Sequence, residues 1–129
     1  MPDAGESKNS ILQTWTKAHS AEYQGQAFID LAFKMRARIE NLALISEITI
    51  TTNKHSHNVI GSGSADPQKY SPDASRETLD HSLPYIFAVA LEDGTWHHEA
   101  SYSEERAHRP ETQIPVSYTH LTLPTINWV

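Results

Sequence analysis

The 129-residue sequence predicts one small domain of the α+β class. Three segments carry this prediction. Residues 21–42 have the apolar spacing of an amphipathic helix, residues 45–53 alternate as a β-strand does, and residues 85–91 form a short apolar run. We therefore expect a core in which helices pack around little β-structure.

The polar residues 1–10 are rich in turn-forming types and predict an N-terminal loop, followed by an extended approach over residues 11–26. The helix in "AEYQGQAFIDLAFKMRARIENL" comes next, with cationic residues near its end, where the helix dipole is negative. Its expected apolar face, at a period near 3.6, consists of Ala27, Phe28, Leu31, Ala32, Met35 and Ile39.

The segment "ISEITITTN" is the best strand, because Ile48 and Ile50 alternate with threonines and all four are β-branched. Residues 61–75 have the composition of a loop. A helix is expected to follow as far as Ser82, capped by either Asp73 or Ser75, and Pro84 must break, kink or restart it. The run "YIFAVAL" is compatible with a buried helix or a buried strand, and the following "EDG" favours the helix.

Composition excludes several classes of function. The net charge of −6 argues against nucleic acid as a partner. No apolar run approaches the roughly 18 residues of a spanning helix, and the first ten residues lack the features of a secretory signal. Without cysteine, this chain has no disulfide, zinc-thiolate site or cysteine-bound iron–sulfur cluster. We expect a cytoplasmic protein that contacts no membrane.

The last fifteen residues read as translated nucleic-acid adapter. Residues 116–125, "VSYTHLTLPT", match the translation of the transposase adapter used in sequencing libraries, codon for codon. We interpret residues 115–129 as a non-native tail to be left out of fold reasoning. The alternative is a genuine β-rich tail, because "VSYTHLTL" alternates well. The adapter interpretation implies that the natural protein continues beyond Ile114.

The segments "HSAEYQGQAFIDLA", "DPQKYSPDASRETLDHSLPYIFAVALEDGTWHHE" and "SYSEERA" resemble the MmgE/PrpD family, and within it the 2-methylcitrate dehydratases. The resemblance covers nearly all of residues 11–114. It implies an α+β fold that is a fragment of the small lid domain of a two-domain enzyme, so residues 11–114 are a partial lid domain. The large N-terminal helical domain of the family would be missing, and we expect it to cover the "YIFAVAL" run and Trp15.

The resemblance also implies an activity. Relatives remove water from 2-methylcitrate to give 2-methyl-cis-aconitate in propionate catabolism, without an iron–sulfur cluster, and we expect this chain to use no cofactor or metal. The substrate would be a small tricarboxylate, and the full-length enzyme would be a homodimer. The isolated fragment is expected to be inactive. Alternatives are another lyase of the family, such as cis-aconitate decarboxylase, and a non-enzymatic His-rich metal-binding module.

Such an elimination needs a base, an acid and cations that hold carboxylates. Relatives place active-site groups in the stretch "TKAHSAEYQGQ", so we expect Lys17 and His19 to be catalytic and Glu22 and Gln24 to bind substrate. Gln24 stands where many relatives carry histidine, and glutamine cannot transfer a proton. The alternative is that Lys17, His19 and Glu22 are ordinary polar residues at a helix start.

The second candidate segment is "SRETLDHSLPY". We expect His81 to be catalytic, because its ordinary pKa of about 6.5 suits proton transfer, and Arg76 and Tyr85 to bind substrate. The alternative role of His81 is to hold its helix by hydrogen bonds.

Two histidine-rich motifs invite a metal interpretation. These are "HSH", with His55 and His57, and "HHE", with His97, His98 and Glu99. Neither spacing matches the zinc motif "HExxH". On a strand, His55 and His57 would share one face, and an exposed face explains them without metal.

Overall fold

The structure is a computed structural model that describes residue 5 and residues 9–124. Within these residues the α-helices are α1 (Gln26–Arg36), α2 (Lys54–Ile60), α3 (Arg76–Asp80), α4 (Leu83–Asp93), α5 (Glu104–Ala107) and α6 (Pro110–Tyr118). The strands are β1 (Ile48–Thr51) and β2 (Thr119–Thr122). Short 3-10 helices span Ser10–Gln13, Tyr23–Gly25, Leu42–Leu44, Ser62–Ser64, Pro67–Tyr70 and Ala100–Tyr102. The predicted α+β class is confirmed; the predicted loop over residues 1–10 falls mostly outside the described residues.

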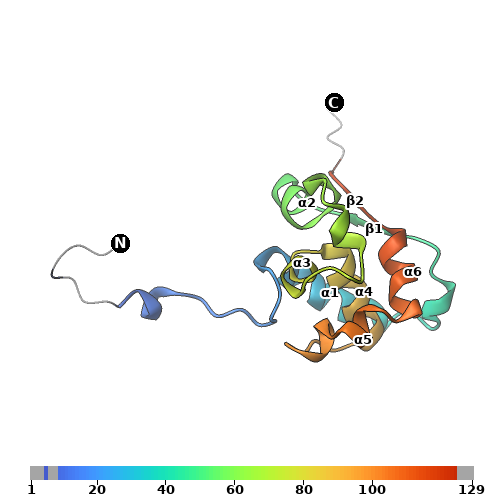
Figure 1. The fold of residues 1–129 in the computed structure, drawn as a ribbon, viewed down its shortest axis with the longest axis horizontal. Coiled ribbons are helices and arrows are strands. Elements are labelled where there is room, and N and C mark those ends of the chain that lie inside the picture. Colours follow the sequence, from blue (N-terminus) through green and yellow to red (C-terminus); the bar gives the residue numbers. More distant parts are fainter. Residues whose placement is uncertain (1–4, 6–8, 125–129) are drawn as a thin grey trace.

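Helix α4 is the centre of the domain, and every residue from Leu83 to Leu91 is buried. One side of α4 packs against α1, the two strands and α2, through a cluster that includes Ile29, Ile50 and Ile60. The other side packs against α3, α5 and α6, through a second cluster that includes Leu79 and Val116. Figure 1 shows the two strands and α2 at one end of the molecule and α5 at the opposite end.

The ends of α4 follow from its sequence. The Ser82 side chain caps the N-terminus by accepting a hydrogen bond from the Tyr85 amide, and Pro84 lies in the first turn, where its missing N–H costs nothing. Gly94 ends the helix in the left-handed region at φ 66°. The prediction of a helix is confirmed. The expectation that a missing domain covers "YIFAVAL" is wrong, because this chain buries the run by itself, whereas Trp15 is 95% exposed.

The predicted apolar face of α1 is partly wrong. Ile29 and Ala32 are fully buried, with Phe28 and Phe33 packed beside them. Ala27, Leu31 and Met35 belong to the predicted face, but all three are exposed in the structure. Because Ile29 meets α4, the buried stripe is rotated relative to the one expected from periodicity alone.

Strand β1 confirms the strand predicted in "ISEITITTN" and pairs in parallel with β2, with Ile48 opposite Thr119 and Ile50 opposite Leu121. Helix α6 and strand β2 include residues 115–122 of the segment interpreted as adapter. That interpretation concerns the origin of the codons and stays a prediction, which the nucleotide sequence around codon 115 would test.

The remaining elements refine the expected boundaries. Ser75, not Asp73, caps α3 by accepting from the Thr78 amide. His55 and His57 lie in α2 rather than on a strand, because Asn53 caps a helix there by accepting from the Ser56 amide. None of the helices in the described part of the chain has the length and apolar character needed to cross a bilayer.

Candidate functional site

An open depression of about 530 Å³ brings together two segments far apart in the sequence. We call it the basin. Its walls are the segment before α1 and the start of the loop between α4 and α5, which lie side by side in Figure 1. The lining residues are Thr16, Lys17, Ala18, His19, Ser20, Trp96, His97 and His98.

The first wall carries Lys17 and His19. The Lys17 ammonium donates to the Ala21 carbonyl at 2.8 Å, which occupies one of its three protons. His19 Nε2 lies 2.9 Å from Asp30 Oδ1, one turn into α1. Gln26 holds the backbone here, because its amide group accepts from the His19 N–H at 2.9 Å and donates to the His19 carbonyl at 2.9 Å. A histidine oriented by a carboxylate can accept or donate a proton in a defined direction.

The second wall carries His97 and His98, whose rings lie 4.4 Å apart. His97 Nδ1 accepts from the backbone N–H groups of Glu99 and Ala100, each at 3.1 Å. The backbone N–H of His97 donates to Ser101 Oγ at 2.9 Å. The wall is therefore built by a compact turn that fixes the His97 ring.

The two walls are joined through the Ser20 carbonyl. It accepts from Trp96 Nε1 at 3.3 Å and from the Tyr102 hydroxyl at 2.6 Å. The same hydroxyl lies 3.1 Å from Asp80 Oδ1. Burial, reinforced by Asp80, raises the pKa of Tyr102 well above its usual value, so this phenol stays protonated and remains a donor.

Arg76 reaches the basin only through its neighbours. Its Nη2 donates to the His98 carbonyl at 3.0 Å, and its guanidinium lies 4.6 Å from the centre of the Tyr102 ring, a cation–π distance. Among the described contacts, Arg76 thus supports the second wall and does not line it.

Glu22, Gln24 and His81 lie outside the basin lining. Glu22 caps the turn Tyr23–Gly25 by accepting from the Gln24 amide at 2.6 Å. The side-chain oxygen of Gln24 is buried without a hydrogen-bond partner among the described residues. His81 ends α3, and its Nδ1 lies 2.9 Å from the Glu77 carbonyl. These contacts agree with the helix-start and helix-holding roles left open as alternatives.

Tyr85 is 1% exposed, and its hydroxyl donates to the Ser101 carbonyl at 2.6 Å. Burial raises the pKa of Tyr85 to about 12. The expected substrate-binding role would require an exposed hydroxyl, so Tyr85 in this structure instead supports the turn that carries His97.

Sequence reasoning missed Lys69, which is 6% exposed. Its ammonium donates to the His81 carbonyl at 2.7 Å, and its own carbonyl accepts from the Ser82 hydroxyl at 2.5 Å. Burial lowers the pKa of Lys69, although Asp66 and Glu22 act in the opposite direction. A single lysine in a loop-like stretch gives no periodic signal, so nothing in the sequence marks it as buried.

A second cavity, of about 550 Å³, lies at the end of α4 against α6 and residues 42–45. It contains none of the residues singled out from the sequence. Within residue 5 and residues 9–124, no three histidine, aspartate or glutamate side chains gather as a metal site would require. The two histidine-rich motifs also lie apart, with His97 and His98 in the basin and His55 and His57 on α2.

Comparison with known proteins gives one family. The family model described as the MmgE/PrpD C-terminal domain matches residues 19–122. No solved structure matches the chain.

Proposed function

Because this chain belongs to the MmgE/PrpD family, whose C-terminal domain matches residues 19–122, we propose that it is the lid region of a cytoplasmic 2-methylcitrate dehydratase. The family consists of dehydratase- and decarboxylase-type enzymes. The family match is the observation that carries the proposal. The choice of 2-methylcitrate rests on the resemblance of residues 66–99 to that branch of the family.

The basin supports this function chemically. Elimination of water beside a carboxylate needs a group that takes a proton and cations that hold the substrate. His19, oriented by Asp30 at 2.9 Å, is suited to proton transfer. Lys17 has two protons left after its bond to the Ala21 carbonyl and is suited to hold a carboxylate.

The proposed enzyme needs a partner that this sequence does not contain. We propose that a large helical domain closes the basin and supplies the remaining catalytic groups, and that the complete enzyme is a homodimer. The open shape of the basin supports this part of the proposal, because small-molecule sites usually enclose most of the ligand's surface. His81, Glu22 and Gln24 lie outside the basin lining, so we propose no contact between them and a substrate in the basin.

The test is a chimera. Residues 9–124 replace the corresponding C-terminal domain of a characterised 2-methylcitrate dehydratase, and the conjugated product is followed by ultraviolet absorbance. We expect the chimera to dehydrate 2-methylcitrate and the isolated 129-residue chain to show no turnover. His19→Gln should lower kcat by about 100-fold or more, whereas Lys17→Met should mainly raise KM, because Lys17 is proposed to hold a carboxylate.

Two outcomes would contradict the proposal. Turnover by the isolated chain would show that no second domain is needed. A chimera that releases carbon dioxide from cis-aconitate, but leaves 2-methylcitrate unchanged, would move the chain to the decarboxylase branch.

A further inference from the structure

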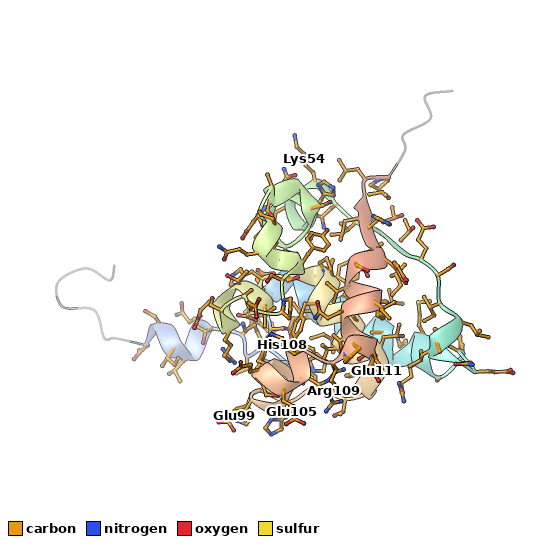
Figure 2. All side chains as sticks on the ribbon, turned by 45° about the vertical axis from the view of Figure 1, so that its right-hand side comes forward. Lys54, Glu99, Glu105, His108, Arg109 and Glu111 are labelled. Atoms are coloured by element: carbon orange, nitrogen blue, oxygen red, sulfur yellow. The ribbon has the colours of Figure 1, made fainter. Side chains whose placement is uncertain are left out.

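The basin is unusual in its charge. The chain carries a net charge of −6, yet the residues that line the basin include one lysine and three histidines and no aspartate or glutamate. The nearest acidic partners lie outside the lining: Asp30 is 2.9 Å from His19, and Glu99 is 3.9 Å from His98. Figure 2 shows Glu99 at the end of the molecule that also carries Glu105. A depression lined by nitrogen donors in an acidic protein favours an anionic ligand.

His97 is held in one tautomer. Two backbone N–H groups, of Glu99 and Ala100, donate to its Nδ1, so that nitrogen carries a lone pair and no proton. In the neutral ring the proton therefore resides on Nε2, which has no partner among the hydrogen bonds of residues 9–124. Since the His97 side chain is exposed in the basin wall, its Nε2–H is a free donor with a fixed direction.

The same tautomer disfavours a metal. A metal ion at Nε2 would require the proton to leave or to move to Nδ1, where two N–H donors already point. An anion needs no such change. The turn is also anchored from outside the basin, because Arg76 donates to the His98 carbonyl at 3.0 Å and Tyr85 to the Ser101 carbonyl at 2.6 Å.

We infer that His97 and Lys17 form a carboxylate-binding subsite across the basin. His97 supplies a neutral N–H donor from the turn after α4, and Lys17 supplies a cation from the segment before α1. The inference rests on the proposed function for the identity of the ligand, a small molecule with several carboxylates. His97 thereby acquires a role as a specificity residue, where the sequence suggested only a metal motif.

The experiment uses the full 129-residue chain, labelled with ¹⁵N, with citrate as the probe at constant ionic strength. Long-range ¹H–¹⁵N correlation reports the tautomer of each histidine. We expect His97 to have its proton on Nε2, and millimolar citrate to shift the His97 ring signals and the Lys17 ammonium signal. His97→Leu removes the proposed hydrogen bond from the His97 Nε2–H to a citrate carboxylate. Because that bond is charge-assisted, its loss should weaken citrate binding about tenfold.

Two variants give the comparison. His97→Asn keeps an oxygen that can accept the two backbone N–H groups and an N–H₂ group that can donate, so it should retain most of the affinity. His55→Leu removes an exposed histidine on α2, beside Lys54 at the opposite end from Glu99 in Figure 2, and should leave affinity unchanged. If His97→Leu does not fold, the shifts in the unsubstituted 129-residue chain and the affinity of His97→Asn still test the inference.

Citrate binding by His97→Leu as tight as by the unsubstituted 129-residue chain would overturn the inference, as would His97 signals that do not respond to citrate. These failures are separable from failure of the proposed function. If the chimera dehydrates 2-methylcitrate but the His97 signals do not respond to citrate, the proposed function stands and the carboxylate-binding subsite is wrong. If the His97 signals respond to citrate but the chimera has no dehydratase activity, the subsite stands and 2-methylcitrate is not the substrate.

Discussion

Arg106 is a buried charged residue that joins three helices of the domain. Its side chain is 3% exposed and donates to Glu92 Oε2 at 2.6 Å and to Asp93 Oδ2 at 2.9 Å. It also donates to the hydroxyl of Thr112, which in turn lies 2.7 Å from Glu92. Burial alone would lower the pKa of Arg106, but the bonds to Asp93 and Glu92 outweigh it and raise the pKa. One guanidinium therefore joins the end of α4 to α5 and α6.

We expect Arg106→Met to lower the free energy of unfolding by about 3 kcal/mol. Removal of one partner from a buried ion pair typically costs about 3–5 kcal/mol, because the remaining charge is left without compensation. Here the side chains of Glu92 and Asp93 are 15% and 25% exposed to solvent. Water can partly solvate the more exposed Asp93, which places the cost at the lower end of that range, although Glu92 Oε1 is buried without a hydrogen-bond partner among the described residues.

Urea denaturation followed by circular dichroism measures the effect, with Arg109→Met as the matched control. Arg109 is half exposed and 4.0 Å from the same Asp93, so its loss should change stability by no more than about 0.5 kcal/mol. Adding Glu92→Gln and Asp93→Asn to Arg106→Met should recover part of the loss, because the stranded charges disappear. If Arg106→Met costs no more than Arg109→Met, the buried network does not stabilise the fold as argued.

Three further predictions concern local conformation and pH. Gly94→Ala should cost at least about 1 kcal/mol in thermal unfolding, because φ is +66° and a Cβ would lie 2.9 Å from Arg36 Cδ; an unchanged midpoint would contradict this. Burial lowers the pKa of Lys69 from 10.5, so between the folded pKa and about 10.5 the unfolded chain binds more protons than the folded chain. The free energy of unfolding, relative to that of Lys69→Met, should therefore rise with pH over this range. A difference in unfolding free energy that does not change with pH would refute the prediction. The pKa of His108 is raised above 6.5 by its bond to the Glu104 carbonyl and by Asp73, so its stabilising contribution should be complete below pH 6.5 and disappear as pH rises through the folded pKa. His108→Gln should remove that pH dependence, and a persisting slope would assign it to another group.

The elements that the sequence predicted best are those with local signals. Helix α4 has a serine cap, a proline in its first turn and a glycine after its end, and each acts within a few residues. Strand β1 consists of four β-branched residues. Neither prediction depends on where the rest of the chain lies.

Two of the errors have a common physical origin, because both depended on tertiary contacts. Periodicity fixed the existence of α1 but not its rotation, and both Ile29 and Leu31 are apolar enough to face a core. The structure buries Ile29 and leaves Leu31 42% exposed. Likewise, an apolar run such as "YIFAVAL" shows that burial is needed, while only the fold shows that α1 and α6 of the same chain provide it.

The basin was predictable in one half only. Lys17 and His19 came from the family resemblance, and the structure places both in one wall. The opposite wall lies almost eighty residues later in the chain, and its motif "HHE" suggested a metal because spacing alone does not reveal a tautomer. The backbone N–H groups of Glu99 and Ala100 decide that tautomer, and they are visible only once the turn is folded.

The structure makes the basin depend on the domain core. Its walls meet at the Ser20 carbonyl, which accepts from Trp96 and Tyr102, and these two rings lie edge to face at 5.3 Å. Tyr102 also stacks on Tyr85, a residue of the central helix. A change that displaces Tyr85 in α4 would therefore also displace the wall that carries His97, because Tyr85 contacts Tyr102 and the Ser101 carbonyl. Lys17 and His97 would then lose their alignment, because neither segment has regular secondary structure of its own to hold it in place.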